Sequence, residues 1–147
     1  MPDFHLSSSV LLHYPLSEVF DFFASAENLN LLTPPWLHFS ILTRLPIEMQ
    51  RGTVIQYRLK LHGIPVRWDS EITEWEPPFR FTDTQIRGPY RLWVHYHRFE
   101  NTPDGTLVAD DVTYRVAGGA LVNRLFVAND LRRIFDYRKA KLLELYP

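Results

Sequence analysis

The sequence predicts a single α+β domain, residues 1–147, in which a curved antiparallel sheet wraps around a long C-terminal helix. Two observations support this fold class. Between residues 53 and 116, apolar and polar residues alternate in segments separated by short turns, the pattern of half-buried strands. After Gly118 and Gly119 the apolar spacing becomes helical and remains so to the last turn. A length of 147 residues suits one domain, and short hairpins favour antiparallel pairing.

A strand and two short helices are expected first. Apolar residues alternate with serines over residues 4–12, which predicts a strand that Pro15 ends. Ser17 is a candidate N-cap for a helix through Ala24. A second short helix should cover residues 26–32, because the two prolines that follow cannot extend it.

The middle of the chain should supply the rest of the sheet. Residues 62–65 form a predicted hairpin turn, and Gly88-Pro89 and the segment 101–105 are further turn signals. The strands predicted between these turns are 53–61, 66–73, 79–87, 90–100 and 106–116.

The C-terminal helix carries a long apolar stripe. A sheet with one apolar face must be covered, and this helix is the only predicted element long enough to cover it along its length. The stripe consists of Leu121, Leu125, Ala128, Leu131, Ile134, Phe135, Leu142 and Leu145.

Composition excludes several classes of protein. The 16 Lys and Arg residues balance 17 Asp and Glu residues, so nucleic acid is not an expected partner. Cysteine is absent, which removes disulfides and thiolate chemistry. No segment reads as a secretory signal or approaches the roughly 20 apolar residues of a membrane span. We therefore expect a soluble protein without stable membrane insertion, with the cytoplasm as the default location.

Three segments of this chain resemble one known superfamily. They are LSEVFDFFASAENLNLLTPPW (16–36), HGIPVRWDSEITEWEPPFRFTDTQIRGPYRLWVHYHRF (62–99) and DGTLVADDVTYRV (104–116). With the element order, they resemble the Bet v 1-like, START-related superfamily, in particular its bacterial polyketide cyclase/dehydrase-like branch. The resemblance implies the helix-grip fold, with a seven-stranded sheet and an internal cavity. It implies no particular ligand, because such proteins include lipid and sterol carriers, hormone binders, cyclases and regulators without a known ligand.

Strand parity brings polar and aromatic side chains together. We assign to the inner face Trp93, His95, His97 and Phe99, the row Thr106, Val108, Asp110, Val112 and Tyr114, and the row Phe79, Phe81, Asp83 and Gln85. An unpaired buried polar group costs about 1–3 kcal/mol, so hydrogen bonds from His95 or His97 to Asp83 or Asp110 are expected. The alternatives are a purely structural polar patch, or the opposite parity with these residues in solvent.

Eleven residues form the predicted ligand-binding set. Part of this set could equally be core filler. Leu32 and Trp36 are expected near a portal, and Arg138 is expected to extend to water from the helix end, or less favourably to pair with an anionic ligand group. The set comprises Tyr57, Trp68, Phe81, Asp83, Trp93, His95, His97, Asp110, Tyr114, Leu131 and Phe135.

Three functions remain open at this level. The first is binding of a small hydrophobic molecule such as a lipid, isoprenoid or aromatic metabolite, which needs only shape and apolar burial. The second is a cyclase or dehydratase in which His95 or His97, oriented by an aspartate such as Asp110, acts as acid or base. The third is a partner-binding adaptor with a filled core.

No cofactor is predicted. Two histidines two residues apart on one strand could bind a metal, but the sequence does not establish a third ligand, and we predict none. The sequence contains no hydrolase or nucleotide-binding motif, and it leaves the oligomeric state open.

Overall fold

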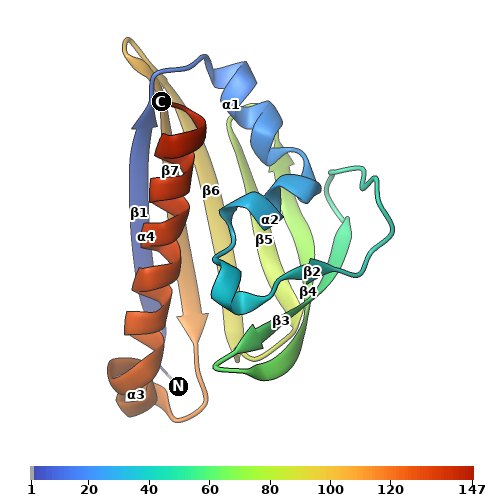
Figure 1. Ribbon diagram of the computed structural model, residues 1–147, viewed down its shortest axis with the longest axis vertical. Coiled ribbons are helices and arrows are strands. Elements are labelled where there is room, and N and C mark those ends of the chain that lie inside the picture. Colours follow the sequence, from blue (N-terminus) through green and yellow to red (C-terminus); the bar gives the residue numbers. More distant parts are fainter. Residues whose placement is uncertain (1) are drawn as a thin grey trace.

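The computed structural model describes residues 2–147 and shows one sheet of seven antiparallel strands in the order β1-β7-β6-β5-β4-β3-β2 (Figure 1). The predicted α+β helix-grip fold is confirmed. The strands are β1 (Phe4–Leu12), β2 (Ser40–Ile41), β3 (Val54–Leu61), β4 (Ile64–Glu76), β5 (Arg80–Arg87), β6 (Leu92–Thr102) and β7 (Gly105–Arg115). The two-residue strand β2 is the one that the sequence pattern did not locate.

Short helical segments connect β1 to β2, and a long helical run ends the chain. The first helix begins at Leu16 directly after Pro15, so the predicted Ser17 cap lies inside the helix. Among the described residues, no helix combines the length and apolarity that crossing a membrane requires. The helical elements are α1 (Leu16–Phe23), η1 (Ala26–Asn28), α2 (Leu29–Leu32), η2 (Pro35–Leu37), α3 (Gly119–Val122), η3 (Asn123–Val127) and α4 (Ala128–Leu145).

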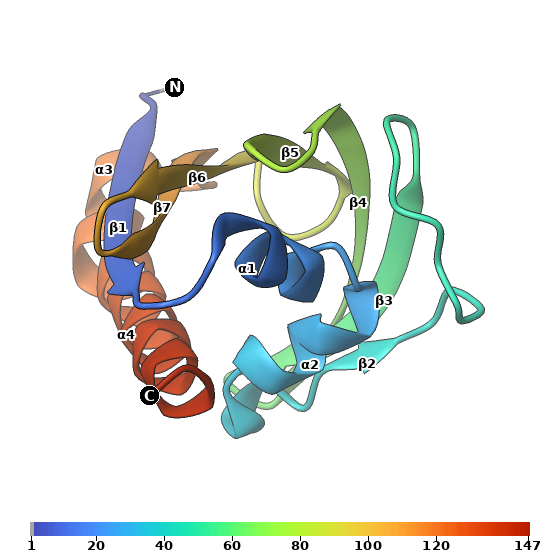
Figure 2. The same cartoon turned by 90° about the horizontal axis from the view of Figure 1, so that it is seen from above.

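The sheet is strongly curved, and β4 contains an evident cause. Its pairing with β5 shifts register between Asp69 and Ser70 and again between Ile72 and Glu74. An extra residue in one strand bends that strand and increases its twist. The strands from β6 to β3 consequently turn around the interior of the molecule, as the view from above shows (Figure 2).

The hairpin between β3 and β4 is tighter than predicted. Leu61 pairs with Ile64, so the turn consists of His62 and Gly63 alone, and Pro65 belongs to the strand. Both turn residues have positive φ, 51° and 81°, which is the backbone of the tightest hairpin turns.

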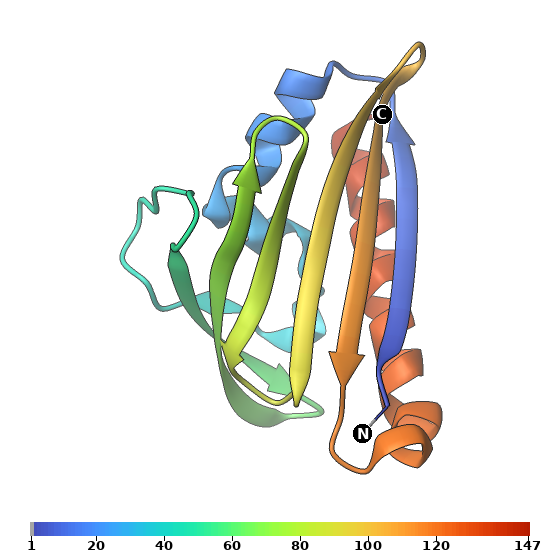
Figure 3. The ribbon, with the colours of Figure 1, turned by 180° about the vertical axis from the view of Figure 1, so that it is seen from behind.

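The long helix does not cover the sheet alone, which corrects the sequence prediction. Helix α4 lies along β1 and β7, while α1 and α2 occupy the hollow between α4 and the far strands (Figures 1 and 2). Phe20 and Phe23 of α1 pack into one buried apolar cluster with Ile72, Phe81 and Phe99 of the sheet. Leu131 and Phe135 of α4 belong to a second cluster around Trp68 and Trp93. From behind, the strands lie in front of the helices, which remain partly visible between and beside them (Figure 3).

The predicted apolar stripe is interrupted near its start. Residues 123–127 form a π-helical turn, which is wider than an α-helical turn and changes the phase of the residues before it. As a result Leu121 and Leu125 are exposed by 65% and 57%, whereas Leu131, Phe135 and Leu142 are buried as predicted.

Candidate ligand-binding cavity

A cavity of about 180 Å³ lies between the concave face of the sheet, α4 and the α1–η2 segment. A dry cavity of about 150 Å³ holds a benzene molecule, so this volume suits a compact ligand. Nine of the eleven predicted ligand-binding residues line the walls. They are Tyr57, Trp68, Phe81, Asp83, Trp93, His95, His97, Leu131 and Phe135.

The other two predicted residues lie outside the lining. Tyr114 is buried against the start of the helical run, where its hydroxyl donates a hydrogen bond to Asn123 Oδ1 at 2.6 Å. Asp110 is buried on β7, beside the histidines rather than on the cavity wall. Both side chains point inward as predicted, but they have protein partners.

Aromatic rings make up much of the wall. Trp68 stacks on Tyr57 with 5.9 Å between ring centroids and meets Trp93 edge-on at 5.3 Å. Phe81 stacks on the His97 ring at 4.1 Å. Burial, followed by the nearby charges of Asp83 and Asp69, raises the pKa of Tyr57 well above its ordinary value, so this residue stays uncharged.

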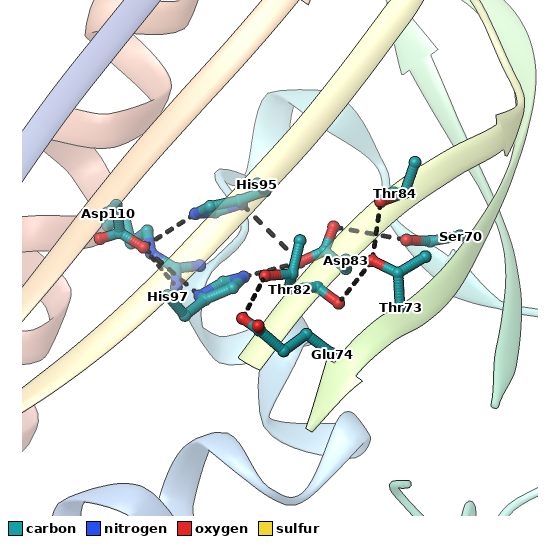
Figure 4. A network of polar contacts seen from close by, with 10 residues as sticks. Ser70, Thr73, Glu74, Thr82, Asp83, Thr84, His95, His97 and Asp110 are labelled. Carbon is teal, nitrogen blue, oxygen red and sulfur yellow. Dashed lines mark hydrogen bonds and ion pairs between the residues drawn. The ribbon is translucent and has the colours of Figure 1, made fainter. Parts of the chain in front are cut away.

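Two histidines and two aspartates form one cluster at the cavity wall, in which His95, His97 and Asp110 are buried and Asp83 is half-buried (Figure 4). His97 Nε2 donates to Asp83 Oδ2 at 2.6 Å, and His95 Nε2 donates to Asp110 Oδ1 at 2.8 Å. In the sheet, Asp83 is directly opposite His95, and Asp110 is directly opposite His97, so both hydrogen bonds cross diagonally. The two imidazole rings stack at 3.7 Å. The histidine–aspartate pairing predicted from strand parity is present.

Arg138 completes this cluster and corrects the sequence prediction. Its side chain does not extend to water: the residue is 9% exposed and lines the cavity. Its Nη2 donates to Asp110 Oδ1 at 3.4 Å, and its guanidinium lies over the Phe23 ring at 5.4 Å. Arg138 is seven residues after Leu131 and three after Phe135, so the spacing places it on the buried helix face but does not show whether its guanidinium reaches water.

The charges of the cluster are distributed unequally between the two histidines. For His97, burial opposes protonation, but the carboxylates of Asp110 and Asp83 on either side of the ring outweigh burial and raise the pKa. For His95, burial and the neighbouring charge of His97 lower the pKa. Despite burial, Arg138 and the histidines hold the pKa of Asp110 well below its ordinary value, and hydrogen bonding to His97 helps lower that of Asp83. The cluster therefore favours protonation of His97 over protonation of His95.

The same side chains offer potential metal ligands. Donor atoms of Asp83, His95 and His97 lie within 4.8 Å of one another. A metal here would replace the 2.6 Å hydrogen bond between His97 and Asp83, and Arg138 places a positive charge in the same cluster. The hydrogen-bonded arrangement accounts for these residues without a cation, and our prediction of no metal remains untested.

Four further residues were expected at the portal or on the inner face of the sheet. Leu32 is buried and lines the cavity, whereas Trp36 is 43% exposed and instead meets Tyr137 of α4 edge-on at 5.8 Å. Phe79, assigned inward, precedes β5 and is 55% exposed. Gln85 is half-buried and holds the turn after β5 through two hydrogen bonds to the Tyr90 backbone.

The curved sheet, the long helix and the internal cavity define a helix-grip protein. A family model described as "Polyketide cyclase / dehydrase and lipid transport" matches residues 12–140, and the chain belongs to this family. Its members typically bind hydrophobic ligands. No curated protein matched in a separate comparison.

Solved structures share this fold at low sequence identity. Protein CV1439 from Chromobacterium violaceum aligns with a TM-score of 0.75 and 12% identity, over 97% of this chain and 96% of that one. The major latex-like protein 151 from Panax ginseng gives 0.66 and 12%, over 94% and 96%. The protein Ara h 8.0201 gives 0.66 and 14%, over 97% and 99%. At these identities the likeness establishes the fold alone.

Proposed function

We propose that this protein binds a small hydrophobic molecule in its internal cavity, as a carrier or sensor. The observation that carries the proposal is the cavity of about 180 Å³, with aromatic walls on the sheet side and Leu131 and Phe135 on the helix side. Each CH₂ group moved from water into such a site contributes roughly 0.8 kcal/mol, so a compact ligand can bind through burial alone.

The test is to look for the ligand directly. Native mass spectrometry of the protein purified from its own source should detect a co-purified small molecule. A library of hydrophobic compounds should raise the melting temperature, since a ligand at 100 times its Kd stabilises the folded state by about 2.7 kcal/mol. The absence of any bound species, together with no thermal shift across the library, would count against the proposal and favour the adaptor function.

A second candidate is a cyclase or dehydratase, which the position of the histidines favours. Both His95 and His97 line the cavity, and their pKa values are shifted in opposite directions, that of His95 downward and that of His97 upward. Such a pair could exchange protons with a substrate at a carbon next to a carbonyl group. Turnover of an aromatic polyketide mimic that is lost in His97→Ala, with ligand binding retained, would support catalysis. Binding without turnover in the wild type would reject it.

A further inference from the structure

Three buried side-chain nitrogens in the described residues 2–147 have no hydrogen-bond partner: Trp68 Nε1, His97 Nδ1 and Arg138 Nε. All three residues line the cavity. Buried polar atoms in folded proteins are overwhelmingly paired, so three orphans on the wall of one cavity indicate groups that a bound molecule would satisfy.

The orphaned atoms share one chemical character. Trp68 Nε1 and Arg138 Nε carry a hydrogen in every accessible state and can only donate. His97 already donates from Nε2 to Asp83, and its Nδ1 lies 3.4 Å from Asp110 Oδ1 but outside hydrogen-bond geometry. The carboxylates on both sides favour the imidazolium form of His97, in which Nδ1 also donates. Three residues that line the cavity therefore carry unsatisfied donors.

The charge of the cluster limits what those donors can bind. Asp83 and Asp110 contribute two negative charges, and Arg138 and the His97 imidazolium contribute two positive charges, so the cluster is neutral. An anionic ligand would leave an excess negative charge in a buried, largely apolar site, which is costly. An uncharged oxygen acceptor satisfies the donors without that cost.

We infer that the ligand is an uncharged, compact hydrophobic molecule bearing carbonyl-type oxygen, which accepts hydrogen bonds from Arg138 or Trp68. This inference rests on the proposed binding function and adds the chemical class of the ligand. A carbonyl oxygen has two lone pairs and no hydrogen, which complements a wall of free donors. Carboxylates of the same shape are disfavoured because of their charge. Pure hydrocarbons of the same shape are disfavoured because they leave the donors unpaired.

Three one-ring probes of similar shape test the inference: acetophenone, ethylbenzene and benzoate. Affinities are measured by NMR titration for the wild type, Trp68→Phe and Arg138→Met. Trp75→Phe is the control, because Trp75 packs on Phe20 outside the cavity lining. For each variant we take the ratio of acetophenone affinity to ethylbenzene affinity. The cost of removing the ketone from water is the same for every variant, so it cancels when these ratios are compared.

We expect this ratio to fall about tenfold in Trp68→Phe or Arg138→Met and to be unchanged in Trp75→Phe. Benzoate should bind the wild type more weakly than acetophenone. A ratio that both cavity variants retain, or tighter binding of benzoate, would overturn the inference while leaving hydrophobic binding intact. Should Arg138→Met fail to fold, Trp68→Phe and the benzoate comparison decide. If none of the probes binds at millimolar concentration although the library screen finds a ligand, the inference fails and the binding function stands. If the library screen and native mass spectrometry find no ligand either, the binding function fails as well.

Discussion

Arg138 of α4 and Asp110 of β7 form a buried ion pair across the boundary between helix and sheet, with Nη2 3.4 Å from Oδ1. Through Asp110 the pair joins His95, and through the stacked imidazoles it joins His97 and Asp83. These five side chains thus form one connected polar network, whose members come from four elements, α4, β5, β6 and β7.

Removing the arginine should destabilise the fold strongly. Arg138→Met keeps the length of the side chain but leaves buried Asp110 without its guanidinium, and breaking such a pair costs about 3 kcal/mol or more. The free energy of unfolding measured in urea should fall by that amount. Arg132→Met, an exposed position on the same helix, is the matched control and should change stability by less than about 0.5 kcal/mol. Equal effects at the two positions would contradict the buried network.

Stability should pass through a maximum near pH 6.5. The folded state lowers the pKa of His95, so its contribution is lost as the pH falls below 6.5, the ordinary value. The folded state raises the pKa of His97. The contribution of His97 to the free energy of unfolding is therefore complete below pH 6.5 and is lost as the pH rises through the pKa of the folded state. The lowered pKa values of Asp83 and Asp110 add a loss of stability at pH values below 3.8.

Urea unfolding across pH 4–9 measures this profile. In His97→Gln the decline above pH 6.5 should disappear, because the titrating imidazole has been removed. A decline that persists unchanged in this variant would assign it to another group and reject the imidazolium state of His97.

Filling the cavity should abolish binding with little effect on folding. Leu131 is 3% exposed and lines the cavity, so Leu131→Trp directs a large ring into the free volume. We expect ligand affinity to fall more than tenfold, with a change in unfolding free energy within about 2 kcal/mol. Leu143→Trp, at a position 47% exposed on the same helix, should bind normally. Calorimetric titration with any ligand found by the library screen provides the measurement.

Trp36 should control the rate of ligand exchange. It bridges η2 and α4 by meeting Tyr137 edge-on, and Arg133 lies over its ring at 5.1 Å. Trp36→Ala removes this bridge without touching the cavity lining, so both association and dissociation should accelerate several-fold at nearly constant Kd. Stopped-flow displacement of a fluorescent hydrophobic probe measures these rates. Phe79→Ala, another exposed aromatic position, should leave them unchanged.

The general fold and much of the cavity could be predicted because strand periodicity is a local property. In β6, alternate residues from Trp93 to Phe99 are buried, and this parity follows directly from the two-residue repeat of a strand. Once the parity of neighbouring strands is known, the meeting of His95 and His97 with Asp83 and Asp110 requires only antiparallel pairing.

Other features depend on how a helix is rotated about its axis and where it packs on the sheet, and strand periodicity does not predict them. A π-helical turn at residues 123–127 rotates the start of the C-terminal helical run, so Leu121 and Leu125 face outward despite their spacing. The α1 segment packs on the concave face through Phe20 and Phe23, a role that its short length did not suggest.

By itself, the sequence determined which side chains of β6 and β7 face inward, because a backbone period of two leaves a residue no other choice once one face is buried. Only the tertiary structure decided that Arg138 is an interior cation rather than a surface one. The depth of a helix end depends on how the curved sheet closes around it, and the bulges in β4 that set this curvature leave no mark in the alternation of the chain.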